Sequence, residues 1–131
     1  MAIEFSILDD KRAVLIEVDG DIDARHLEQL RKRAAEIISE TGYTDFIIDL
    51  RNVTSLEQGK VVRIVELGES FSESRITVWS NTAILMPVDE TAFKQVELMH
   101  TIQINRGRGV ISYVESLDEA FSWFEEMATR T

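Results

Sequence analysis

Two nearly continuous apolar segments, FIIDL over 46–50 and TAILMPV over 82–88, most constrain the fold of this chain. Such runs, without polar alternation, are typical of parallel strands that are covered on both faces. A third, less apolar segment, GVISYV over 109–114, follows the same pattern. Stretches with helical spacing lie between them, so the sequence predicts alternating strands and helices.

The chain begins with two short alternating segments. Apolar residues at 3, 5 and 7, and again at 14, 16 and 18, flank the polar turn DDKR, which predicts an antiparallel hairpin. Apolar residues then recur at helical spacing from Leu27 to Ile38, which predicts a helix. Asp21 or Asp23 can cap its start, and Gly42 suits a left-handed residue at its end.

Three more helices are expected, over about 56–71, about 90–104 and 116–127, the last with a capping box of Ser116 and Glu119. The predicted order is β–β–α–β–α–β–α–β–α, an α/β fold with a mixed, mostly parallel sheet. No linker or internal repeat interrupts residues 1–131, which we expect to form a single domain. SESRITVW, over 72–79, fits a loop, an extra short strand or an early start of the fourth strand equally well.

Few residues carry recognisable chemistry. The absence of cysteine excludes disulfides, thiol catalysis and cysteine metal sites. The chain has only two histidines: we expect His26 to be a solvated surface residue and His100 to be partly buried, and neither lies in a metal-binding motif. A nucleophile elbow and a glycine-rich phosphate loop are also missing. We therefore expect no enzymatic activity, no metal and no cofactor.

The charge balance bears on the choice of partner. A net charge of −10 repels polyanions, so we expect no nucleic-acid binding. It also disfavours attraction to anionic lipid, although the sequence leaves peripheral membrane contact open. No apolar run approaches the roughly 20 residues of a membrane span, and no leader opens the chain. These observations predict a cytoplasmic protein.

Three segments together resemble a known family: FIIDLRNVTSLEQG over 46–59, TAILMPVDETAF over 82–93 and VISYVESLDEAFSWF over 110–124. In this order and spacing they resemble the STAS-type, SpoIIAA-like family, in particular its small stand-alone bacterial branch, over nearly the whole chain. The resemblance implies a small α/β fold, no catalytic centre and a regulatory role through a protein contact or a small or apolar ligand. CRAL-TRIO lipid carriers have a similar fold, so a lipid-like ligand is conceivable by analogy.

The resemblance also bears on regulation by phosphorylation. The anti-sigma-factor antagonists of that family carry the motif D-L-x-x-V-x-x-[LIM]-D-S-x-G, in which the serine is phosphorylated. The matching positions are Asp49, Leu50, Val53 and Leu56. Glu57 and Gln58 stand where the family has the aspartate and that serine. The resemblance therefore implies the scaffold without the serine switch. A local alternative is that Ser55 and Gln58 simply form a capping box at a helix start.

We expect a binding cleft at the carboxyl end of the parallel sheet, beside the starts of the second and third helices. The candidate residues, with plain packing as the alternative, are Leu56, Glu57, Gln58, Phe93, Val96, Met99 and His100. One hypothesis is a non-enzymatic domain that binds an apolar small molecule or lipid-like ligand. The other is a signalling module that binds a protein partner without a phosphoserine. Homodimerisation, for example through RITVW at 75–79, stays open.

Overall fold

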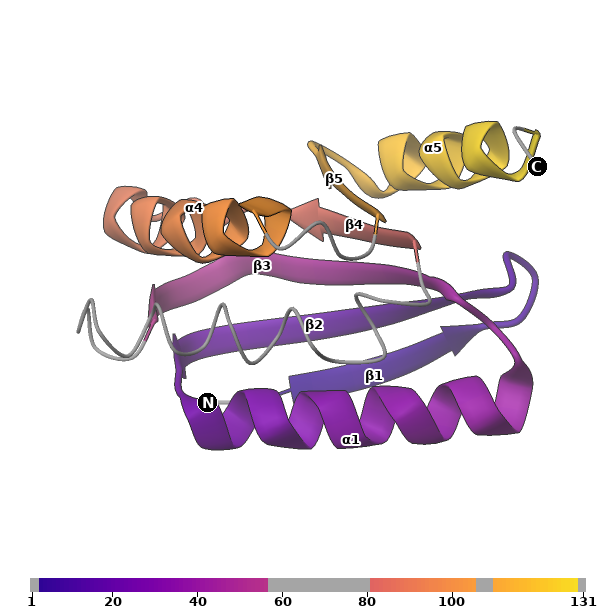
Figure 1. The fold of residues 1–131 in the computed structure, drawn as a ribbon, viewed down its shortest axis with the longest axis horizontal. Coiled ribbons are helices and arrows are strands. Elements are labelled where there is room, and N and C mark those ends of the chain that lie inside the picture. Colours follow the sequence, from indigo (N-terminus) through magenta and orange to yellow (C-terminus); the bar gives the residue numbers. More distant parts are fainter. Residues whose placement is uncertain (1–2, 57–80, 106–109, 130–131) are drawn as a thin grey trace.

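The computed structural model has a five-stranded sheet with helices on both faces (Figure 1). The structure describes residues 3–56, 81–105 and 110–129, without the side chains of residues 24, 99–105 and 110. The elements are β1 (Ile3–Leu8), β2 (Ala13–Ile22), α1 (Ala24–Thr41), β3 (Asp45–Leu56), β4 (Asn81–Leu85), α4 (Glu90–Asn105), β5 (Val110–Val114) and α5 (Leu117–Thr129).

The sheet has the mixed topology that the sequence predicts. Its strand order is β1-β2-β3-β4-β5, in which β1 pairs with β2 antiparallel and the other neighbours are parallel. The hairpin register sets Ile3 opposite Val18 and Phe5 opposite Ile16, as the two alternating patterns require. The predicted mixed, mostly parallel α/β fold is therefore confirmed. The helix expected over about 56–71 lies outside the described residues apart from Leu56, and so does the unassigned segment 72–79.

Three strand ends differ from the prediction, since β2 also runs past its last alternating apolar residue, Val18, to Ile22. β3 continues to Leu56 because the long β2 pairs with it as far as Ile22, so the polar stretch after Leu50 is still strand. The register shifts on the way, between Glu17 and Asp19 and again after Gly20. β4, in contrast, ends before the predicted residue 88. Pro87 follows soon after its end, and a proline has no N–H for a sheet ladder.

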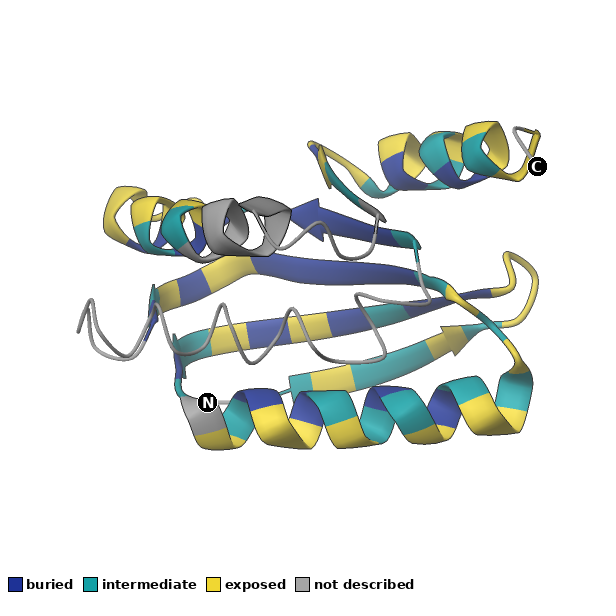
Figure 2. Ribbon diagram, in the orientation of Figure 1, coloured by how far each residue is buried: buried dark blue, intermediate teal, exposed yellow. Residues whose placement is uncertain are grey.

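Each face of the sheet has its own core. Right-handed crossovers in one direction, from β2 to β3 and from β4 to β5, place their helices α1 and α4 on one face. α1 and α4 accordingly share a face and bury Leu30, Ile37 and Val96 against the sheet. α5 covers part of the other face with Ala120 and Phe124. Figure 2 shows the result: β4 and the first half of β3 are almost continuously buried, whereas buried and exposed positions alternate along the middle of β2.

The caps of α1 follow the sequence closely. Asp23, rather than Asp21, is the N-cap, and its carboxylate accepts a hydrogen bond of 2.9 Å from the N–H of His26. Gly42 ends the helix in the left-handed region, at φ 76°, and its N–H donates to the carbonyl oxygen of Ile38 at 2.8 Å. In α5, the Ser116 hydroxyl accepts from the N–H of Glu119 at 3.1 Å, which is one half of the predicted capping box.

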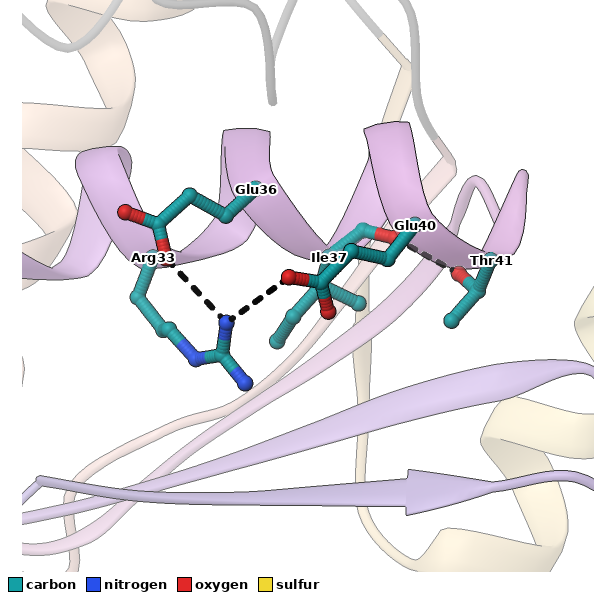
Figure 3. Close-up of polar contacts among 5 residues, drawn as sticks. All are labelled: Arg33, Glu36, Ile37, Glu40 and Thr41. Carbon is teal, nitrogen blue, oxygen red and sulfur yellow. Dashed lines mark hydrogen bonds and ion pairs between the residues drawn. The ribbon is translucent and has the colours of Figure 1, made fainter.

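The outer side of α1 carries ion pairs, which Figure 3 shows. The Arg33 guanidinium lies 3.1 Å from Glu36 and 3.7 Å from Glu40. The Thr41 hydroxyl donates to the carbonyl oxygen of Ile37 at 2.7 Å, which satisfies one backbone group of the last turn. Exposed pairs of this kind contribute little to stability, so the buried stripe of α1 is what holds it on the sheet.

Candidate functional site

The carboxyl ends of the parallel strands form the edge where open α/β folds commonly bind ligands. The pairing of β3 with β4 stops at Asp49, but β3 itself continues to Leu56. The backbone groups on this side of β3 therefore need other partners. The N–H of Val88 donates to the carbonyl oxygen of Arg51 at 3.2 Å, and the N–H of Leu56 donates to the side-chain oxygen of Gln95 at 2.7 Å. These two bonds attach the β4–α4 loop and α4 to the end of β3.

The start of α4 leaves two apolar side chains exposed at this edge. Asp89 caps the helix: its carboxylate accepts from the N–H of Ala92 at 2.9 Å, and its carbonyl oxygen from the N–H of Phe93 at 2.8 Å. The Val88 side chain just before the cap is 81 % exposed, and Phe93 in the first turn is 38 % exposed. Apolar groups held outward on a fixed loop and helix are typical of contact surfaces.

The residues predicted for the site are divided between the interior and the surface. Leu56 and Val96 are buried and line the same apolar cavity, whereas Phe93 lies on the outer side of α4. Glu57 and Gln58 lie outside the described residues, as do the side chains of Met99 and His100. The binding role of all seven residues stays a prediction.

That cavity lies between α1, α4 and the sheet and has a volume of about 30 Å³. This is room for a group about the size of a water molecule. Apart from one histidine, its described walls are apolar: Ile3, Val18, Ile22, His26, Leu27, Leu30, Ile48, Leu50, Leu56, Ile84 and Val96. Leu56 and Val96 of the predicted site thus share this cavity with residues of α1. The sequence gave no reason to connect α1 with the site.

His26 is half-buried at this cavity, so the prediction of a solvated surface residue is wrong. Its side chain is 22 % exposed, and its Nδ1 is buried without a hydrogen-bond partner among the described residues. An oxygen of Asp23, which also accepts the backbone N–H of His26, lies 2.8 Å from this nitrogen and would form an ion pair with a protonated imidazole. His26 and Ile22, the last residue of β2, both line the cavity. Neighbouring charges in the sequence gave no sign of this position.

A charged pair lies on the opposite face of the sheet at the same edge. The Arg51 guanidinium binds Asp49 through two hydrogen bonds, of 2.8 and 3.0 Å, and the Arg51 N–H adds a third of 3.1 Å. Burial raises the pKa of Asp49, but the bonds from Arg51 outweigh this effect and hold the pKa below its ordinary value of 3.8. The carboxylate therefore stays charged and fixed where the pairing of β3 with β4 ends, opposite Leu85.

Further acidic residues surround this pair. A groove of about 140 Å³ is lined by Glu4, Glu17, Val18, Asp19, Asp49 and Asn52. The strand register sets Glu4 opposite Glu17 and Glu17 opposite Asp49, so carboxylates from three strands share one row. In the sequence these residues are only outward positions of separate strands. The row makes this face of the edge negative and unfavourable for anions.

Two further classes of site can be addressed in the described part of the chain. Across residues 3–56, 81–105 and 110–129, His, Asp and Glu side chains do not gather in threes that could hold a metal ion. Among the helices in these ranges, none combines the length and the apolar composition that a membrane span needs.

Sequence comparisons find no relatives: no protein-family model matches the chain, and no curated protein matches it. Comparison of structures does find similar chains. The anti-sigma factor antagonist SpoIIAA in its unphosphorylated form superposes with a TM-score of 0.52 at 15 % identity, over 95 % of this chain and 98 % of its own. An anti-sigma factor antagonist from Mycobacterium paratuberculosis gives 0.54 at 15 % identity, over 99 % and 96 %.

A third similar structure is an uncharacterised protein of the DUF3478 family from Shewanella loihica PV-4, described as having a SpoIIAA-like fold. It superposes with a TM-score of 0.53 at 18 % identity, over 93 % of this chain and 91 % of its own. All three alignments span nearly the full length of both chains, so the whole architecture is shared. This chain has the SpoIIAA-like, STAS-type fold.

Proposed function

We propose that this protein is a non-enzymatic regulatory module that binds a protein partner at the carboxyl edge of its sheet. The observation that carries the proposal is the exposure of Val88 and Phe93 on a loop and helix that are bonded to the end of β3. A contact surface needs apolar groups whose positions are fixed before the partner arrives, because ordering them on binding costs free energy. The backbone that carries both side chains is held in this way, since the N–H groups of Val88 and Phe93 donate to the carbonyl oxygens of Arg51 and Asp89.

The relatives support a partner of this class. Two of them are anti-sigma factor antagonists, a name that specifies a protein target. Their likeness to this chain concerns the fold, so the regulatory role is carried over as part of the proposal. Gln58 has no hydroxyl to phosphorylate, so the proposed module acts without the serine switch of that family. Glu57 and Gln58 stay candidates for the partner surface.

The test uses charge substitutions on the proposed surface. Tagged wild type, Val88→Asp and Phe93→Asp are used to capture proteins from the source cell, and the captured proteins are quantified by mass spectrometry. Ile7→Asp is the matched control, since Ile7 is also 38 % exposed but lies on β1, away from this edge. We expect a specific partner to be lost with both edge variants and kept with the control. A partner that survives both edge variants would refute the proposed surface.

An apolar small molecule or lipid-like ligand is the second candidate, favoured by the apolar cavity lined by Leu56 and Val96. With a volume of about 30 Å³, the cavity admits a lipid-sized ligand only if α1 and α4 move apart. Because binding would require this movement, the small-molecule ligand is a weaker candidate than the protein partner. Native mass spectrometry of gently purified protein, combined with lipid extraction, tests it. Repeated recovery of the bare chain would remove this candidate.

A further inference from the structure

A larger cavity lies at the opposite end of the sheet, near the β1–β2 turn. Its volume is about 500 Å³, within the range of about 300–1,000 Å³ that is typical of small-molecule sites. Three separate parts of the chain form its walls: the turn after β1, the loop between α1 and β3 with the first residue of β3, and α5 from Phe121 onward (Figure 1). It is distinct from the edge that carries Val88 and Phe93.

Two aromatic rings of this cavity already accept cations from the chain itself. The Arg12 guanidinium lies 5.2 Å from the centre of the Tyr43 ring, and the Lys11 ammonium lies 5.1 Å from the centre of the Phe121 ring. Both distances are within the roughly 6 Å of a favourable cation–π contact. The rings come from different walls, and each presents its face to a positive charge.

The charges around the cavity favour a cation over an anion. Its lining has three carboxylates, Asp10, Asp45 and Glu125, against the two cations Lys11 and Arg12. α1 and α5 also end at this side, and neither has a basic residue in its last turn. The carbonyl ends of both helices therefore add partial negative charge that no cationic side chain of those turns offsets; the hydroxyls of Thr41 and Thr129 each bond one carbonyl oxygen there.

Asp45 is the carboxylate most in need of a positive neighbour. Burial raises its pKa, and the hydrogen bond of 3.1 Å that it accepts from the Asn81 side chain offsets this effect only in part. A carboxylate that has lost hydration is stabilised by a cation at short range. An ammonium group in the cavity would supply that charge.

We propose that this cavity binds a small organic cation, namely an amine carried on an aromatic or apolar body. The ammonium lies beside Asp45, and the body packs against Phe121 and Phe124. Lys11 occupies the face of Phe121 in the structure and therefore competes with such a ligand. Because of this competition, removing the Lys11 side chain should make the organic cation bind more tightly.

The first experiment compares three probes with the same body by isothermal titration calorimetry at neutral pH and physiological salt. These are phenethylamine, neutral 2-phenylethanol and anionic 3-phenylpropionate. We expect phenethylamine to bind at least about tenfold more tightly than the other two, since the charge is the only large difference between them. Absence of phenethylamine binding at millimolar concentration, or equal binding of the three probes, would overturn the proposal.

The second experiment uses charge-matched variants. Lys11→Met should tighten phenethylamine binding several-fold, whereas Lys32→Met, which removes the same charge from the surface of α1, should leave it nearly unchanged. Asp45→Asn should weaken binding about tenfold, with Asp118→Asn at the other end of α5 as its control. Weaker binding in Lys11→Met, or an equal gain in Lys32→Met, would show that the cavity is no cation site. If Asp45→Asn does not fold, the lysine pair alone decides.

Discussion

The N–H of Leu56 donates a hydrogen bond of 2.7 Å to the side-chain oxygen of Gln95, which lies 39 positions later in the chain. It joins the last residue of β3 to α4. Leu56 is buried, so water cannot readily satisfy its N–H if Gln95 is removed. The side chain of Gln95 thus supplies an acceptor on the side of β3 where the pairing with β4 has ended at Asp49.

Replacing Gln95 should therefore destabilise the protein more than its half-exposed position on a helix suggests. Gln95→Met keeps the length and helix propensity of the side chain but removes the acceptor. We expect the free energy of unfolding in urea to fall by about 1–3 kcal/mol, the usual cost of a buried unsatisfied donor. Hydrogen exchange of the Leu56 amide should become faster. Gln29→Met, at an exposed position of α1, is the control, and an equal loss in both variants would contradict this role for Gln95.

The pair of Asp49 and Arg51 predicts an acid-dependent loss of stability. The pKa of Asp49 is lowered in the folded protein: burial raises it, and the bonds from Arg51 more than reverse that effect. The pKa of Asp49 is lower in the folded than in the unfolded protein. The pair therefore stabilises the fold fully at pH values above the ordinary pKa of 3.8. This contribution is lost as the pH falls through the folded pKa. The Arg51 side chain is 47 % exposed, so solvent screening keeps the contribution small.

Arg51→Met tests this assignment. Without the guanidinium, burial dominates, and we expect the pKa of Asp49, followed by carboxyl NMR during an acid titration, to rise. The stability of the variant should then depend less on pH below about pH 5 than that of the wild type. Arg31→Met removes an exposed pair with Glu28 and should leave the Asp49 titration unchanged. An unchanged pKa of Asp49 in Arg51→Met would contradict the proposed cause.

Much of the fold could be predicted because local patterns agree with it. The alternation around Phe5 and Ile16 gives the register of the hairpin, and the apolar run at residues 46–50 gives a strand with both faces covered. The extension of β3 was missed because the residues from Arg51 to Ser55 are mostly polar. They continue as strand only because β2 extends beside them. The Ser55 hydroxyl donates to Asp21 on that strand, a partner that lies 34 positions away in the sequence.

The candidate site was less predictable, because long-range packing arranges it. Phe93 and Val96 were both candidates for the cleft, yet Phe93 is exposed and Val96 is buried. Val88 was assigned to a strand because it ends an apolar run, whereas it lies in the loop after β4 and is exposed. The contacts of Gln95 with β3 and of His26 with the cavity join segments far apart in the sequence. No local pattern encodes them.

At Gly42, which ends α1, the cost of a left-handed backbone can be measured without any clash from an added side chain. Gly42 has φ 76°, and a Cβ added there would meet nothing within 4 Å. Gly42→Ala should therefore cost only the left-handed conformation, about 1 kcal/mol of the free energy of unfolding. Gly42→Asn should cost less, because asparagine tolerates this conformation better. Chemical denaturation of both variants measures this order, and a Gly42→Ala variant as stable as the wild type would contradict it.

The apolar cavity predicts that one core position tolerates a larger side chain. Val96 is fully buried and borders a cavity of about 30 Å³, so Val96→Ile has space for its extra methylene. We expect a gain of about 0.8 kcal/mol in the free energy of unfolding, the usual value for one buried methylene. Ala83 is equally buried, on the α5 side of β4, and does not line this cavity. Ala83→Val should instead destabilise by about 1–3 kcal/mol through overpacking. Equal losses in the two variants would show that the cavity closes around the wild-type valine in solution.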